Sequence, residues 1–138
     1  MGMVEWIREV IAKAEKDDDI KAVLIKVNSP GGTVTASDII LHELLLFKEK
    51  QAIPIYVHVM DLAASGGYYI ALAGDEIAAH PTSLIGSIGV IAFKVNLENL
   101  MGKIGVDWEI VKSGDKKDFM SPFRSFTDEE RELFQKNH

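Results

Sequence analysis

One serine stands between small residues in the segment Ala63-Ala64-Ser65-Gly66-Gly67, directly after an apolar stretch. A second glycine-rich segment, Asn28-Ser29-Pro30-Gly31-Gly32, follows another apolar stretch. Glycines allow sharp turns and leave backbone N–H groups uncovered, so a ligand oxygen can approach them closely. Two such N–H donors can stabilise the negative charge that develops on a carbonyl oxygen under attack. We interpret Ser65 as a candidate nucleophile; the alternative is a helix N-cap, where serine is also favoured.

A nucleophilic serine needs a base to accept its proton. The four histidines, none of them well placed for this role, are His42, His58, His80 and His138. A lysine can act as the base at neutral pH only if desolvation or a neighbouring cation lowers its pKa from about 10.4. Residues 111–123 contain three lysines, Lys112, Lys116 and Lys117. Each can equally be a solvated surface charge, and composition does not choose among them.

Composition excludes several other kinds of chemistry. The chain has 138 residues, no cysteine and a net charge of -6, with its basic residues mostly scattered. Nucleic acid is therefore not expected as a partner, and disulfides and thiolate chemistry are absent. The sequence contains no metal-binding or phosphate-binding motif, so we expect no metal and no cofactor. Its apolar runs are too short to span a bilayer, so we expect the chain as given to be soluble.

The elements that would position these residues alternate between strands and helices. Apolar residues at helical spacing predict a helix over residues 4–14, and residues 22–27 predict a strand covered on both faces, as in parallel sheets. The further predictions are helices at 35–50, 65–73 and 96–101, strands at 53–60, 76–80 and 107–112, and a last helix from Thr127 with a Thr127-x-x-Glu130 capping box. We predict one α/β domain over residues 1–138, with repeated β-α-β units and a mainly parallel sheet flanked by helices.

Three motifs then point to a known family. They are Val27–Gly32 (VNSPGG), Ala63–Val90 (AASGGYYIALAGDEIAAHPTSLIGSIGV) and Lys112–Phe123 (KSGDKKDFMSPF). In this order and spacing they resemble the signal peptide peptidase A (SppA) family, serine peptidases of family S49 with the Clp-crotonase fold. The resemblance covers roughly residues 21–135 and implies that fold for this chain.

The resemblance also implies roles for individual residues. Ser65 falls on the family's nucleophile and Lys117 on its general base, with Lys116 the residue most easily confused with it. The backbone N–H groups of Gly32 and Gly66 correspond to the oxyanion hole. Ser87, in Gly86-Ser87-Ile88-Gly89, is a candidate hydroxyl for orienting the lysine, and a structural turn serine is the equal alternative. A Ser-Lys dyad of this kind would cleave residual signal peptides and other unfolded hydrophobic peptides.

The family's assembly and location suggest further expectations. Its members form rings or domes in which one site can combine the serine and lysine of neighbouring protomers, so we expect a homo-oligomer. Family members are usually tethered to the bacterial inner membrane with an extracytoplasmic catalytic domain. We therefore expect this chain to be a fragment that lacks a membrane anchor or first strand before it and helices after it.

Two rival functions remain from other classes. One is a catalytically inactive scaffold or membrane-adaptor protein of the same fold, in which the glycine corners serve only assembly. The other is an acyl-CoA enzyme of the crotonase type, which uses a similar pair of glycine N–H groups. Crotonases place acidic catalytic residues near the second corner, where this chain has only Asp61.

Overall fold

The computed structural model describes residues 2–136, which form two compact units. Of the described residues, 2–90 belong to unit 1 and 91–136 to unit 2. The sequence predicts a single domain, and whether both units act as one domain stays a prediction.

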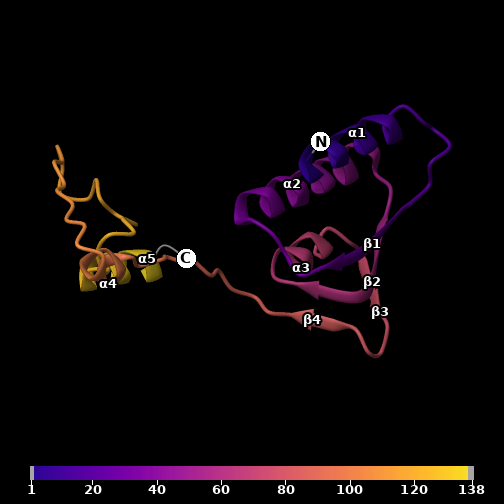
Figure 1. The fold of residues 1–138 in the computed structure, drawn as a ribbon. Coiled ribbons are helices and arrows are strands. Elements are labelled where there is room, and N and C mark those ends of the chain that lie inside the picture. Colours follow the sequence, from indigo (N-terminus) through magenta and orange to yellow (C-terminus); the bar gives the residue numbers. More distant parts are fainter. Residues whose placement is uncertain (1, 137–138) are drawn as a thin grey trace. The chain divides into compact units, whose positions relative to one another are not determined.

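Unit 1 is built around a parallel sheet (Figure 1). Strand β1 (Val23–Ser29) pairs with β2 (Ile55–Ala64), and β2 pairs along its other edge first with β3 (Glu76–Ala79) and then with β4 (Leu84–Gly86). The pairing of β1 with β2 shifts register between Val27 and Ser29. All pairs are parallel, which confirms the predicted class of fold.

The core lies on one face of this sheet. Along β2 the buried side chains alternate, as Ile55, Val57 and Val59, and helix α2 (Val34–Gln51) covers them with Ile40, Leu44 and Phe47. In β1 the same alternation leaves Leu24 61% exposed. The prediction of a strand covered on both faces is therefore wrong for the described chain: residues 22–25 are all apolar, but only every second side chain of β1 points toward the core.

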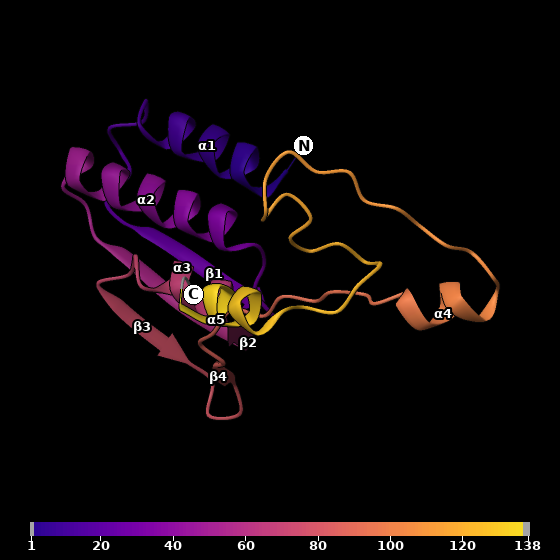
Figure 2. The same ribbon diagram turned by 90° about the vertical axis from the view of Figure 1, so that its left-hand side faces the viewer.

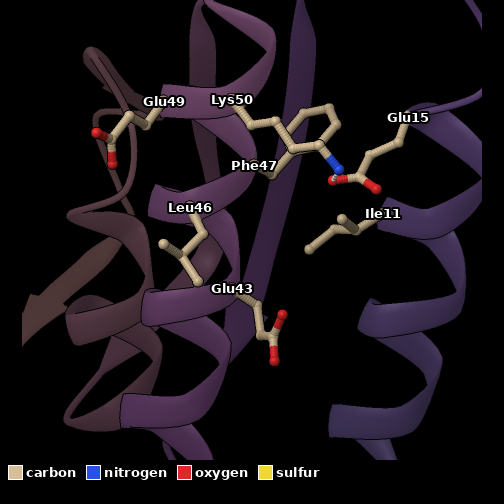
Figure 3. A pocket seen from close by; sticks show the side chains of 7 residues that line it. All are labelled: Ile11, Glu15, Glu43, Leu46, Phe47, Glu49 and Lys50. Atoms are coloured by element: carbon tan, nitrogen blue, oxygen red, sulfur yellow. Dashed lines mark ion pairs between the residues drawn. The ribbon is translucent and has the colours of Figure 1, made fainter.

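Helices α1 (Met3–Ala14) and α2 run side by side (Figure 2). Thr33 caps α2, because its hydroxyl accepts a hydrogen bond from the N–H of Ala36 over 3.3 Å. Two ion pairs join the helices: Arg8 with Glu43 at 2.7 Å, and Lys50 with Glu15 at 2.9 Å. The second spans the shallow pocket between the helices (Figure 3). This pocket does not include the glycine corners.

The described part of unit 2 contains two helices and long irregular segments. Helix α4 (Glu98–Lys103) is the predicted short helix, and α5 (Asp128–Lys136) is the predicted last one. The capping box is confirmed, since the N–H of Glu130 donates to Thr127 Oγ1 at 3.2 Å and the N–H of Thr127 to Glu130 Oε2 at 2.9 Å. The strand predicted at residues 107–112 is wrong: this segment is irregular. It has β-branched residues but no neighbouring strand pairs with it in the described chain.

None of the helices formed by residues 2–136 combines the length and the apolar character that crossing a membrane requires.

Candidate active site

Ser65 occupies the corner between β2 and helix α3 (Gly66–Ala71) in an unusual backbone conformation. Its φ of 50° and ψ of -120° lie outside the regions that residues with a side chain favour. Such strained residues persist where the surrounding structure holds them, and they cluster at active sites. The conformation turns the chain sharply from strand to helix, as the small neighbours of Ser65 suggested.

The Ser65 side chain does not cap α3. Its hydroxyl lies 3.5 Å from the carbonyl oxygen of Gly89, while its backbone N–H donates to the Gly86 carbonyl at 2.9 Å. Ser65 thus occupies the N-cap position of α3 but does not make the side-chain capping hydrogen bond for which serine is favoured there. The hydroxyl is therefore not used in capping the helix.

The two glycine corners pack directly against each other. Gly31 has a φ of 108°, and a Cβ added to it would lie 2.9 Å from Ser65 Cβ. A Cβ on Gly66 would overlap the Ser37 hydroxyl and lie 3.2 Å from the Gly32 nitrogen. Side chains at Gly31 and Gly66 are thus excluded by contact, and a positive φ also favours glycine at Gly31. The sequence predicted two corners at one sheet edge, and the structure places them in contact.

The structure also brings the two predicted oxyanion-hole amides together. Among residues 2–136, no protein acceptor takes a hydrogen bond from the N–H of Gly32 or of Gly66. Two adjacent N–H groups without a protein acceptor, beside a serine hydroxyl, are the elements of a site for a carbonyl oxygen that gains negative charge. Their role in catalysis stays a prediction.

Other residues considered for this corner have different surroundings. Ser87 is exposed, with a φ of 52°, and stands beside Gly86, whose carbonyl holds Ser65. That the Ser87 hydroxyl orients the catalytic lysine stays a prediction. His80 is exposed, and its Nδ1 lies 2.8 Å from the hydroxyl of Thr82. Asp61, the acid that a crotonase-type reading would need, accepts a hydrogen bond from the side-chain amide of Asn28 at 3.2 Å.

Sequence reasoning missed two polar residues close to this corner. Ser37 of α2 is buried beneath Gly66, and its hydroxyl donates to the Thr33 carbonyl at 3.0 Å. Tyr69 of α3 donates from its hydroxyl to Asp38 Oδ1 at 3.1 Å, and this hydrogen bond raises the pKa of Tyr69 above its ordinary value. Ser37 lies outside the three motifs, and Tyr69 lies within the second one, but its contact with Asp38 of α2 joins residues 31 positions apart, which a local motif does not reveal.

The three candidate lysines, all in unit 2, differ in their ion-pair partners. Lys112 pairs with Asp118 at 2.9 Å, and Lys116 pairs with Glu129 at 2.8 Å. The Lys116–Glu129 hydrogen bond raises the pKa of Lys116, which makes it a poorer base at neutral pH. Lys117 is exposed and has no ion-pair partner among the described residues. Of the three, Lys117 is the lysine not engaged with a carboxylate.

Within residues 2–136, no group of three or more histidine, aspartate or glutamate side chains is arranged to hold a metal ion.

Comparison with known proteins identifies the family. The sequence model of Clp protease matches residues 3–85, which span most of unit 1, and that of peptidase family S49 matches residues 47–137, more than half of the chain. The chain belongs to peptidase family S49. The matched S49 region includes both Ser65 and Lys117, and the Clp protease match confirms the predicted fold class.

Three curated relatives are 36–42% identical to this chain over the aligned residues. A candidate protease of Methanocaldococcus jannaschii is 42% identical over 88% of this chain and 39% of its own length. A candidate signal peptide peptidase SppA of Enterococcus faecium is 42% identical over 91% and 36%. The chloroplast serine protease SPPA of Arabidopsis thaliana is 36% identical over 98% and 20%. The chain thus spans well under half the length of these S49 relatives.

Proposed function

We propose that this chain contains the catalytic residues of a serine endopeptidase that uses a Ser-Lys dyad. The observation that supports this most directly is the corner itself, with a strained Ser65 beside two backbone N–H groups that donate to no protein acceptor in the described chain. Membership of family S49 supports peptidase chemistry at that corner. Ser65 is the proposed nucleophile and Lys117 the proposed base.

In the proposed reaction, the neutral amine of Lys117 accepts the proton of the Ser65 hydroxyl as the oxygen attacks a peptide carbonyl carbon. The N–H groups of Gly32 and Gly66 bind the resulting oxyanion. The C–N bond then breaks, and the lysine ammonium gives its proton to the departing amine. Water attacks the acyl-enzyme, its proton passes to Lys117, and the Ser65 hydroxyl is restored as the acid product leaves.

The proposed substrates are signal-peptide remnants and other unfolded hydrophobic segments. The resemblance to the SppA family and the name of the Enterococcus relative support this choice. An extended peptide has its carbonyl groups free for two backbone N–H donors, whereas in a folded protein those carbonyls are already hydrogen-bonded. Folded proteins are therefore not expected as substrates.

We also propose that the active form is a homo-oligomer, tethered to the bacterial inner membrane with its catalytic part outside the cytoplasm. Resemblance to the SppA family supports this proposal. Several large apolar side chains are exposed, among them Leu84 and Ile88 in unit 1 and Val111 in unit 2, and an oligomer interface could bury some of them. In the proposed assembly, one site combines Ser65 of one copy with Lys117 of its neighbour.

The decisive experiment measures hydrolysis of a fluorogenic hydrophobic peptide by the purified, assembled protein. Ser65→Ala and Lys117→Ala should each lower kcat by at least about 1,000-fold, since members of a catalytic unit are each indispensable. Lys116→Ala is the matched control and should retain wild-type activity. Activity that survives Ser65→Ala would overturn the nucleophile assignment. A folded, assembled but silent wild type would favour the scaffold function instead.

Sharing of sites between copies has its own test. Ser65→Ala and Lys117→Ala chains are inactive separately, but a mixed oligomer should recover activity. In the mixture some sites combine the intact serine of one variant with the intact lysine of the other. Mixing that restores no activity, although subunits exchange, would show that each site uses a serine and a lysine from one chain.

A further inference from the structure

Arg124 of unit 2 makes an unusually complete set of hydrogen bonds. Its guanidinium has five N–H donors, and the structure supplies five acceptors. These are Asp118 Oδ2 at 2.7 Å, the Asp118 carbonyl at 3.3 Å, the Ser125 carbonyl at 3.0 Å, Glu130 Oε2 at 2.7 Å and Glu130 Oε1 at 2.5 Å. The side chain therefore joins segments six residues before it and six residues after it.

The two carboxylates that Arg124 joins are nearly buried. The Asp118 and Glu130 side chains are 9% and 8% exposed, and Lys112 completes the group by donating to Asp118 Oδ1 at 2.9 Å. We call Lys112, Asp118, Arg124 and Glu130 the Arg124 cluster. The hydrogen bonds that Arg124 donates hold the pKa of Asp118 well below its usual range and lower the pKa of Glu130 to about 2. Both carboxylates therefore stay ionised and bound at neutral pH.

The cluster holds the chain directly beside Lys117. Asp118 is the next residue, and Arg124 binds both its carboxylate and its backbone carbonyl. Around it, the N–H of Lys117 donates to the Gly114 carbonyl at 3.2 Å and the N–H of Ser121 to the Asp118 carbonyl at 3.0 Å. The Lys117 backbone thus lies in a tightly bonded turn, while its own side chain stays exposed and outside the cluster.

We propose that Arg124 is a positioning residue, which fixes the backbone that presents the Lys117 amine. This inference rests on the proposed role of Lys117 as the general base. Arg124 contacts no reacting atom in this proposal. It acts through Asp118, whose side chain and carbonyl it immobilises on the C-terminal side of the lysine.

Lysine cannot replace arginine in this role. An ammonium has three donors on one nitrogen and lacks the planar fork that binds a carboxylate through two parallel hydrogen bonds. Arg124→Lys would keep the charge of the cluster but leave acceptors on Glu130 or Asp118 without a donor. A displacement of about 1 Å in a catalytic group can lower the rate by about 100-fold. Charge alone should therefore not preserve activity.

The catalytic test compares Arg124→Lys with Arg131→Lys, the same change at an exposed arginine on α5 that has no ion pair in the described chain. Arg124→Lys should lower kcat about 10- to 100-fold with little change in KM, because the lysine is displaced but substrate contacts are not. It should also shift the pH profile of kcat, since the surroundings of the base change. If Arg124→Lys only lowered the fraction of folded protein, kcat would fall by the same factor at every pH, and the pH profile would not shift.

A second measurement is independent of catalysis. In Arg124→Lys, hydrogen exchange of the Lys117, Phe119 and Ser121 amides should become faster, while amides within α4 keep their wild-type protection. Loss of protection throughout unit 2 would mean that Arg124 only stabilises the fold, which would overturn the proposal. Exchange and kcat that match those of Arg131→Lys would overturn it as well.

The outcomes separate this inference from the proposed function. If Lys117→Ala keeps its activity, the general-base assignment fails, and the positioning role fails with it whatever the exchange shows. If Lys117→Ala is inactive but Arg124→Lys is as active as wild type, the dyad stands and only the positioning role is wrong.

Discussion

Units 1 and 2 are stabilised by different kinds of interaction. In unit 1, apolar side chains of β2 and α2 form a core in which Ile55 and Val59 are 0% exposed. In the described part of unit 2, the one buried residue is a charged one, Glu130, and several aromatic rings contact one another. Trp108 lies 5.7 Å from Phe123, measured between ring centroids, and Phe119 lies 5.8 Å from Phe126.

The apolar core of unit 1 and the hydrogen-bonded cluster of unit 2 suit the different requirements of the two candidate catalytic residues. Ser65 needs a backbone strained into a rare conformation, and a close-packed core with touching glycine corners can hold that strain. Lys117 needs an unpaired amine on a fixed backbone, which the Arg124 cluster provides through ordered hydrogen bonds. It also needs desolvation to be neutral, and in the proposed assembly the neighbouring copy would supply this. The two tryptophans allow each unit to be followed separately, with Trp6 in unit 1 and Trp108 in unit 2.

The largest expected effect comes from removing a core side chain in unit 1. Ile55→Ala should lower its free energy of unfolding by about 2–5 kcal/mol, because a fully buried side chain is lost and a cavity remains. Urea unfolding followed by Trp6 fluorescence in a Trp108→Phe background measures this loss. In unit 2, Val111→Ala removes a side chain that is 95% exposed and should change the stability by less than about 0.5 kcal/mol. Equal effects would contradict the contrast between the units.

The next effect tests the glycine corner. Gly31→Ala should lower stability through backbone strain of about 1–3 kcal/mol, and it should also reduce peptide hydrolysis, because the new Cβ presses on Ser65. Gly105→Ala is the matched variant: its φ is 69°, but no atom lies within 4 Å of the added Cβ, so strain acts without a new contact. Urea unfolding and kcat are measured for both. If Gly105→Ala harmed activity as much as Gly31→Ala, contact between the corners would not explain the loss.

A smaller, selective effect is expected in acid. The folded-state pKa of Glu130 is lowered to about 2 from an ordinary 4.5, and that of Asp118 is lowered as well. Their stabilisation is therefore complete above the unfolded-state pKa values and is lost as the pH falls from about 4.5 toward about 2. Trp108 fluorescence in a Trp6→Phe background should report this loss in unit 2. Glu130→Gln should remove much of the pH dependence. An unchanged acid transition in that variant would show that protonation of Glu130 does not cause the loss of stability.

The smallest effect concerns Tyr69 of unit 1. Its hydrogen bond to Asp38 raises the pKa of the phenol above its ordinary value. That hydrogen bond is fully present below pH about 10 and is lost as the pH rises through the raised pKa. Ultraviolet difference titration against Tyr69→Phe isolates this group, and Asp38→Asn should return its titration to about pH 10. A titration that Asp38→Asn leaves unmoved would rule out the hydrogen bond as its cause.

Local signals in the sequence predicted much of the secondary structure. Apolar spacing located α1 and α2, and the Thr127-x-x-Glu130 box located the start of α5, because each signal acts within a few residues. The strand predicted at residues 107–112 failed for the opposite reason. A strand requires a partner elsewhere in the chain, and local β propensity does not supply one.

The sequence by itself determined the parallel α/β fold of unit 1, the glycine corners and the residues that match family S49, since all of these depend on residue type and short spacing. Only the tertiary structure decided three further points. It showed that Ser65 is strained and does not cap α3, that Gly31 and Gly66 pack against the other corner, and that Lys112 and Lys116 are paired whereas Lys117 is not. Each of these depends on contacts between residues distant in sequence or on side-chain direction, which residue types alone do not specify.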